Sequence, residues 1–176
     1  MTNVRAPSSA RDSGVAPPVD PARLLLRHTL ATLAYRASKA LRDAPASFAG
    51  FRAGATTRAP VEILAHMGDL FDWALHLARG HYTWNTSTPQ QWPQEVERFF
   101  TALTALDVYL ASDAPLGYSA ETLFQGPVAD ALTHTGQLML LRRLSGHPAR
   151  GESYARADIA IGRTSLEQAA PRVEFD

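Results

Sequence analysis

The sequence predicts an all-α protein, namely a four-helix bundle with a disordered N-terminal tail and a short helical C-terminal segment. Four stretches of roughly 20 residues carry apolar side chains at three- and four-residue spacing, which is the period of an amphipathic helix. Pro, Asp and Gly residues mark the ends of these stretches, as they do at helix boundaries. The sequence shows no convincing strand pattern and no internal repeat. Together these observations favour antiparallel-type packing of four helices.

The first helix is expected to follow an unstructured segment. Residues 1–19 are rich in Pro, Ser, Ala and Arg without periodicity, and we expect them to form a disordered tail. Asp20 is a suitable N-cap and Pro21 suits the first helical position, so a helix is predicted from there through Asp43. Its main apolar stripe consists of Leu26, Leu30, Leu33, Ala37 and Leu41. The segment 44–59 contains Pro, Gly and Thr residues and is interpreted as a loop long enough to carry function.

The second and third helices are predicted from Pro60 to Gly80 and from Pro93 to just before Pro115. The second helix has two inward stripes, one of which contains His66. Its opposite side is expected to face solvent and carries Asp69, Asp72, His76 and Arg79. The stripe of the third helix holds no titratable side chain, so this helix is interpreted as core and scaffold.

The fourth helix is predicted between Pro127, whose fixed φ suits a first turn, and Gly146, which suits a left-handed cap. A possible short turn from Ser119 precedes it. Its apolar stripe consists of Ala131, His134, Leu138 and Leu141, and Asp130 lies one turn before His134. Because four helical residues rise by about 6 Å, an Asp and a His at this spacing can point to one place. Beyond it, a short helical tail is expected over residues 154–163.

Composition narrows the classes of function. The chain has 176 residues with 17 basic and 17 acidic side chains, and this balance argues against a nucleic-acid partner. It has no Cys, which excludes disulfides, a thiolate nucleophile and thiolate-ligated metals. No apolar run approaches the length of a membrane span, so we expect a cytoplasmic protein without a membrane partner. One domain is expected over residues 20–165, followed by a C-terminal tail at 166–176.

The inward titratable residues lead to a metal hypothesis. His66, Asp130 and His134 offer two imidazoles and a carboxylate, which suit a divalent first-row metal with open positions for water or substrate. Gln137, one turn beyond His134, suits a hydrogen-bond partner for that imidazole. The loop at 44–59 and the tail near Tyr154 and Asp158 are expected to shape the pocket.

A second interpretation needs no metal. A lone inward histidine is more often a hydrogen-bonded core residue than a ligand, and an acidic residue in a first helical turn is favoured by the helix dipole alone. His28 is interpreted as an edge residue, His76 and His81 as solvated, and His147 as part of a Gly/Pro turn. Trp84 and Trp92 suit either a pocket mouth or packing over helix ends. The residues alone leave these interpretations open.

Two segments resemble the DinB-like (YfiT-like) superfamily of four-helix-bundle metalloproteins. The first is Pro60-Val-Glu-Ile-Leu-Ala-His66-Met, and the second is Asp130-Ala-Leu-Thr-His134-Thr-Gly-Gln137-Leu. The Leu-Arg-Arg-Leu run and the Gly-Glu-Ser-Tyr tail that follow are also similar. The resemblance covers about residues 20–165, and its most specific part is the His-x-Gly-Gln segment.

The resemblance implies a divalent metal, such as Zn, Ni, Mn or Fe, bound in the family by three histidines. His66 and His134 match two of these positions, and Asp130 stands where the family has its other histidine. It further implies a metal-dependent enzyme that activates a thiol or water, that is, a thiol S-transferase or a hydrolase acting on a small electrophilic substrate. A low-molecular-weight thiol is then an expected partner, and homodimerisation through a helical face is a further hypothesis. The alternative is a metal-free bundle with a degenerate metal site that binds a small molecule or a protein partner.

Overall fold

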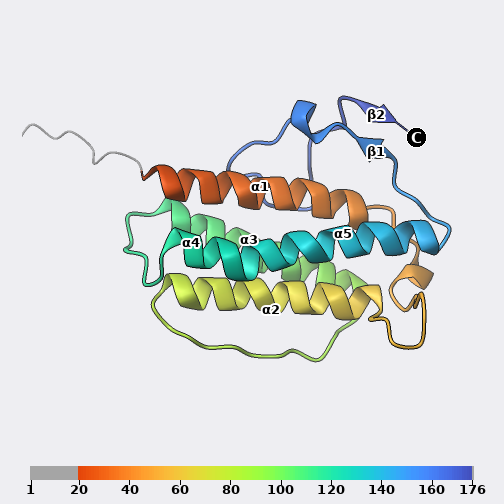
Figure 1. The fold of residues 1–176 in the computed structure, drawn as a ribbon, viewed down its shortest axis with the longest axis horizontal. Helices are drawn as coiled ribbons and strands as arrows, with labels where there is room; N and C mark the ends of the chain where they lie inside the picture. Colours follow the sequence, from red (N-terminus) through yellow and green to blue (C-terminus); the bar gives the residue numbers. More distant parts are fainter. Residues whose placement is uncertain (1–19, 176) are drawn as a thin grey trace, which may run out of the picture.

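The computed structural model describes residues 20–175, so the tail expected at 1–19 lies outside the described residues. The described part is mostly helical, which confirms the all-α class (Figure 1). Its helices are α1 (Pro21–Leu41), α2 (Pro60–Ala78), α3 (Trp92–Ala111), α4 (Ala120–Leu123) and α5 (Ala129–Leu144), and its two short strands are β1 (Gly151–Glu152) and β2 (Glu174–Phe175). None of the described helices has the length and apolar character that crossing a membrane requires.

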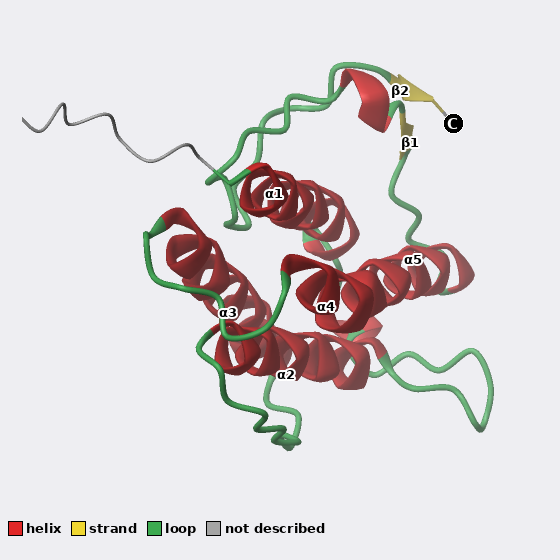
Figure 2. Ribbon diagram, turned by 60° about the vertical axis from the view of Figure 1, so that its left-hand side comes forward, coloured by secondary structure: helices red, strands yellow, loops and turns green. Residues whose placement is uncertain are grey.

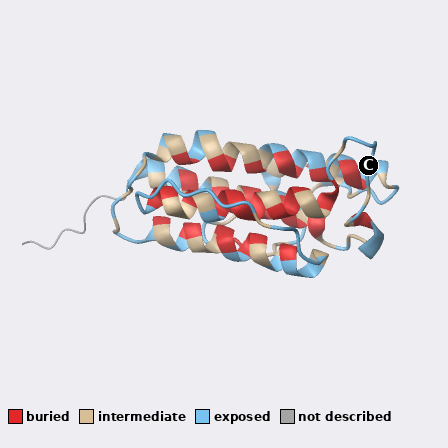
Figure 3. Cartoon of the chain, turned by 90° about the horizontal axis from the view of Figure 1, so that it is seen from below, coloured by how far each residue is buried: buried red, intermediate tan, exposed pale blue. Residues whose placement is uncertain are grey.

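The four long helices share one apolar core. α1 packs against α3 and α5, and α2 packs against the same two helices, so each long helix has two neighbours (Figure 2). The buried side chains lie where the helices face one another, while the outward sides are exposed (Figure 3). The predicted stripes of α1, α2 and α3 supply most of this core, because residues at helical spacing come to lie on one side.

The direction of the chain differs from simple antiparallel packing, because α2 and α3 run side by side in the same direction. After α2 the connection 79–91 returns along the length of that helix before α3 begins (Figure 1). The contacts agree: Arg98 near the start of α3 pairs with Asp69 in the middle of α2, and the Gly117 N–H beyond α3 donates to the carbonyl of Ala78 at the end of α2. A connection of this length reaches about 40 Å when extended, which is enough to span a helix of about 30 Å.

The helix starts agree with their local signals. The Asp20 carboxylate accepts a hydrogen bond from the N–H of Ala22, and Pro21 occupies the first turn. Pro60 opens α2 in the same way, and the Glu62 carboxylate accepts from the N–H of Ala59. These hydrogen bonds satisfy donors that a helix start otherwise leaves unpaired.

Several helix ends differ from the expectation by a few residues. α1 ends at Leu41 rather than Asp43, because Arg42 is already extended. α2 ends at Ala78 rather than Gly80, and α3 begins at Trp92 and ends at Ala111. Helix boundaries commonly vary by one or two residues at each end, and these differences leave the position of each apolar stripe unchanged.

The expectation that the last helix begins at Pro127 is wrong. Ser119 caps α4 instead, and α4 continues through a π-helical segment, Phe124–Val128, directly into α5. In an α-helix the ring of Pro127 would collide with the carbonyl four residues earlier. The wider π turn avoids this collision, and the N–H of Ala129 reaches the carbonyl of Phe124.

The C-terminal segment is mostly extended rather than helical. Only Tyr154–Arg156 forms a short 3-10 turn, which is less than the helix expected over 154–163. β1 and β2 then pair antiparallel beyond α1 (Figure 1). Glu152 of β1 is buried and accepts hydrogen bonds from Tyr35 (2.6 Å) and Lys39 (2.8 Å) of α1. Burial, together with the hydrogen bond to Glu152, raises the pKa of Tyr35. These contacts attach the segment to α1.

Candidate metal centre

Three predicted residues meet between α2 and the start of α5. His66 lies in the second turn of α2, and Asp130 and His134 lie one turn apart on α5. The Asp130 carboxylate lies between the two imidazoles: Oδ2 is 3.3 Å from Nε2 of His66, and Oδ1 is 3.3 Å from Nε2 of His134. The expected proximity of these side chains, which are far apart in the sequence, is therefore confirmed.

The donor atoms have the composition of a divalent metal site and lie close to one another. One ligand atom from each residue lies within 4.8 Å of the others. Two ligands bound to the same first-row ion at about 2.1 Å are separated by roughly 3 to 3.5 Å, and the carboxylate meets this spacing with both imidazoles. Two nitrogens and one oxygen also suit zinc and its neighbours better than magnesium or calcium. The group can hold a divalent metal ion.

Gln137 fixes the other side of the His134 ring. Its Oε1 lies 2.9 Å from Nδ1 of His134, and because an amide oxygen only accepts, this hydrogen bond forms in the tautomer that carries the proton on Nδ1. In the neutral ring Nε2 then has a free lone pair that points at Asp130 Oδ1. Two acceptors facing each other repel unless a proton or a cation lies between them, so either one stabilises the contact between Nε2 and Oδ1.

The group is accessible from solvent on one side. The side chains of His66, Asp130 and His134 are 23%, 45% and 11% exposed. The two imidazoles pack edge to face with ring centroids 4.9 Å apart, and the indole of Trp84 covers part of His66 with centroids 5.7 Å apart. A small molecule can therefore reach the carboxylate without opening the core.

The continuous helix removes one explanation for Asp130. Its position was also attributable to the helix dipole, which favours an acidic residue in a first turn. Asp130 instead lies well inside the helix that begins at Ala120, where the preceding turns pair the N–H groups. Its placement opposite His66 remains as the structural explanation.

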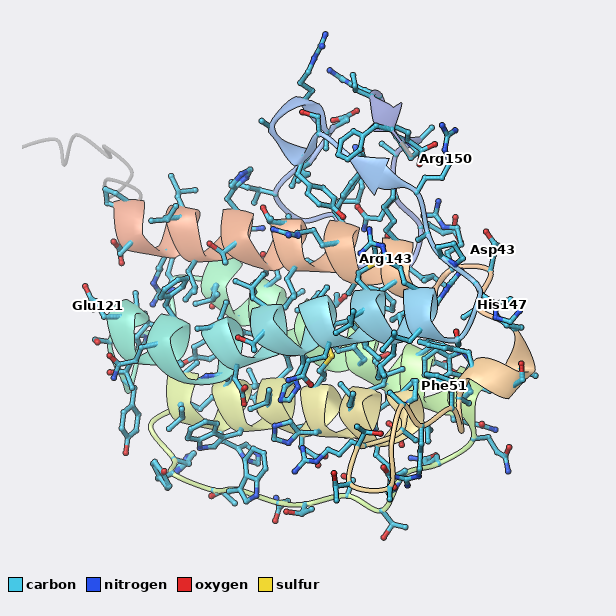
Figure 4. All side chains as sticks on the ribbon, turned by 45° about the vertical axis from the view of Figure 1, so that its right-hand side comes forward. Asp43, Phe51, Glu121, Arg143, His147 and Arg150 are labelled. Atoms are coloured by element: carbon cyan, nitrogen blue, oxygen red, sulfur yellow. The ribbon has the colours of Figure 1, made fainter. Side chains whose placement is uncertain are left out.

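The other histidines lie outside the group. His81 is exposed, as expected, and so are His28 and His147. His147 lies beyond the end of α5, at the opposite end of the molecule from Glu121 (Figure 4). Nδ1 of His76 lies 3.3 Å from the carbonyl of Thr83, in the connection after α2. These four residues offer no second cluster with the Asp or Glu residues of the described part.

The pocket walls differ from those expected. Tyr154 packs against Tyr35 and lies under the guanidinium of Arg36, both on α1, so it belongs to a different face of the molecule. The residue that contacts the group is Trp84, from the connection 79–91. Trp92, the first residue of α3, packs instead against Phe48.

A buried charge cluster holds that connection, and sequence reasoning missed it. Asp69, expected to face solvent, is buried and pairs with Arg98 at 3.0 Å. Arg98 also donates to the buried Glu95, and although burial alone lowers its pKa, its bonds to Glu95 and Asp69 raise the pKa above the usual value. Asp69 and Glu95 in turn accept from the N–H groups of Ser87 and Gln90. The only signal in the sequence was the three-residue spacing of Glu95 and Arg98.

No protein-family model, curated protein or solved structure matches this chain. The resemblance to the DinB-like superfamily therefore rests on the residues quoted above alone.

Proposed function

We propose that this protein is a metal-dependent enzyme of the DinB-like type, in which the four long helices form the family's bundle around a divalent metal. The proposed reaction transfers a low-molecular-weight thiol to a small electrophilic substrate, or hydrolyses that substrate. The observation that carries the proposal is the arrangement of His66, Asp130 and His134, with both imidazole Nε2 atoms 3.3 Å from the same carboxylate.

The residues of the chain have distinct tasks in this proposal. His66 and His134 would hold the metal through Nε2, and Asp130 would supply an oxygen between them. Gln137 keeps the proton of His134 on Nδ1, so that Nε2 is available. When bound, a divalent metal supplies a positive centre that lowers the pKa of a thiol or water toward neutrality.

Exposure of the group supports an active rather than a purely structural site. Three protein ligands leave coordination positions free, whereas structural zinc sites usually have four. Asp130 is the most exposed of the three side chains, so free positions face solvent rather than the core. The Trp84 indole covers only part of His66.

The first test is the metal content of untagged protein, measured by mass spectrometry after removal of loosely bound ions. We expect close to one metal per chain in the unaltered protein and little in His66→Ala or His134→Ala, each with the helical signal retained. His76→Ala is the matched control, since it removes a histidine from the same helix outside the group, and its metal content is expected to stay unchanged.

Two results would overturn the proposal. Full metal content in His66→Ala would place the metal elsewhere. Metal bound only by Asp130→His, and not by the unaltered chain, would show a degenerate site and favour the metal-free alternative. With metal established, consumption of a small thiol in the presence of chlorodinitrobenzene, absent in His134→Ala, tests the transfer reaction.

A further inference from the structure

The connection 79–91 places an exposed aromatic ring beside the metal centre. The indole of Trp84 is 40% exposed, although large aromatic side chains are usually buried, and it contacts His66 edge to face. Its Nε1–H donates to Oγ1 of Thr86 at 3.0 Å, which limits rotation of the ring. The ring therefore has a defined position at the edge of the candidate site.

Buried carboxylates hold the segment that carries this ring. Asp69 accepts from the N–H of Ser87 at 3.0 Å, and Glu95 accepts from the N–H of Gln90 at 2.8 Å. Both carboxylates are almost fully buried and bind Arg98. Charge-assisted hydrogen bonds of this kind are stronger than neutral ones, so the connection is attached firmly across α2 and α3.

Further aromatic rings continue the surface away from the metal centre. The ring centroids of Trp73 on α2 and Trp84 lie 5.6 Å apart, with the ring planes at 89°. Those of Tyr82 and Trp73 lie 5.7 Å apart, with the planes at 80°. Tyr118, from the connection after α3, lies 6.5 Å from Tyr82. We call Tyr118, Tyr82, Trp73 and Trp84 the aromatic strip.

Two rings of the strip, Tyr82 and Trp84, are exposed, whereas Trp73 and Tyr118 pack against the core. Tyr82 is 70% exposed, and neither it nor Trp84 belongs to the buried core. The buried Nε1–H of Trp73 has no hydrogen-bond partner among the described residues, so this ring is held by packing alone. Neighbouring rings at right angles form corners that suit a flat ring, because aromatic pairs favour edge-to-face and offset contacts.

The charge of the metal centre defines the other half of the ligand. With both imidazoles neutral, the single carboxylate of Asp130 leaves a divalent ion with net positive charge. An anionic donor group on a ligand would complement this charge, and the strip would contact the body of the ligand. The contact between the anionic donor group and the metal rests on the proposed function, whereas the contact between the ligand and the aromatic strip does not.

We propose that the substrate class of this site is a small flat aromatic molecule bearing an anionic donor group, such as a carboxylate or a thiolate. Its ring packs against the aromatic strip at Trp84, and its donor group lies at His66, Asp130 and His134.

The test compares benzoate with cyclohexanecarboxylate, which have the same charge and similar size but differ in flatness. Each is titrated into metal-free and zinc-loaded protein, and binding is followed by the NMR signals of the tryptophan indole N–H groups. We expect benzoate to bind about fivefold more tightly in both forms and to shift the Trp84 signal. Zinc is expected to raise the affinity for both anions by tenfold or more.

Variants separate the two halves of the proposal. Trp84→Ala is expected to remove the preference for benzoate, Trp84→Phe to retain part of it, and Phe175→Ala to leave it intact, since Phe175 is similarly exposed on β2 at another face. Equal affinity for the two anions, or an unchanged preference in Trp84→Ala, would overturn the aromatic contact. A preference for benzoate that persists without any effect of zinc would overturn the donor half while leaving the aromatic contact in place, and the metal centre itself is decided by the metal content described above.

Discussion

At the scale of single residues, Gln137 decides which nitrogen of His134 faces the carboxylate. Its side-chain oxygen binds Nδ1, so the neutral ring presents Nε2 as an acceptor toward Asp130. Partners of this kind orient metal-binding imidazoles and raise their basicity. The exposed position of Gln137 means that substitution there leaves the core intact.

Replacing Gln137 by Leu should therefore weaken metal binding without unfolding the protein. We expect the zinc affinity to fall by about 10- to 100-fold, because the imidazole loses its orienting acceptor. Gln137→Glu, which keeps an acceptor oxygen, should retain most of the affinity. Competition with a coloured chelator measures the zinc affinity of both variants.

Gln125→Leu is the control, since Gln125 is an exposed glutamine in the π-helical segment of the same continuous helix. If Gln137→Leu binds zinc as tightly as this control, Gln137 has no role in the metal site.

At the scale of elements, the π-helical segment and the end of α2 determine how the helices meet. The extra residue of the π turn changes the rotation of everything that follows, so it sets the side of α5 on which Asp130 lies. The end of α2 is fixed by a close backbone contact. Gly80, just beyond α2, has φ of +87°. A Cβ added to Gly117 would lie only 2.1 Å from the Cα of Gly80.

Gly117→Ala should thus destabilise the protein, whereas Gly136→Ala should not. The added methyl at Gly117 meets backbone that cannot move aside, and we expect the free energy of unfolding to fall by about 1–3 kcal/mol. At Gly136 an added Cβ meets nothing within 4 Å. Ala in this exposed helical position should therefore raise the free energy of unfolding by about 0.5–1 kcal/mol.

Urea denaturation of the two variants measures both changes. Equal stability of the two would contradict the close contact between Gly80 and Gly117.

At the scale of the whole molecule, Arg98 joins α2, α3 and the connection between them. It binds Asp69 of α2 and Glu95 of α3, and it donates to the carbonyl of Ala65 at 2.5 Å. The same two carboxylates accept from the backbone of 79–91. This cluster therefore supports the parallel course of α2 and α3.

Arg98→Met should destabilise the protein strongly, because it leaves Asp69 and Glu95 buried without their cation. We expect the free energy of unfolding to fall by about 3–5 kcal/mol, as when one partner of a buried ion pair is removed. Arg52→Met is the matched control, since its pair with Glu62 lies at the surface, where solvent screens the charges, and should contribute much less to stability.

Guanidinium denaturation compares the two variants. A loss in Arg98→Met as small as that in Arg52→Met would show that the cluster contributes little to the fold.

The helices and their inward sides could be predicted from local sequence patterns. Asp20 with Pro21 and the Pro60 turn begin helices through contacts within a few residues, and apolar spacing then selects the buried side. For the same reason His66 and His134 were assigned inward, and the four-residue spacing placed Asp130 beside His134. Such features depend on neighbours along the chain, so a pattern of residues is enough to predict them.

The way these elements meet depends on contacts between distant parts of the chain. The parallel course of α2 and α3, the π turn around Pro127, the burial of Asp69 and the contact of Trp84 with His66 involve residues distant in the sequence or packing against another helix. The 3.3 Å distances from Asp130 to both imidazoles likewise depend on the packing of α2 against α5. Periodicity gives the side of a helix but not its partner, because many helix arrangements bury the same stripes.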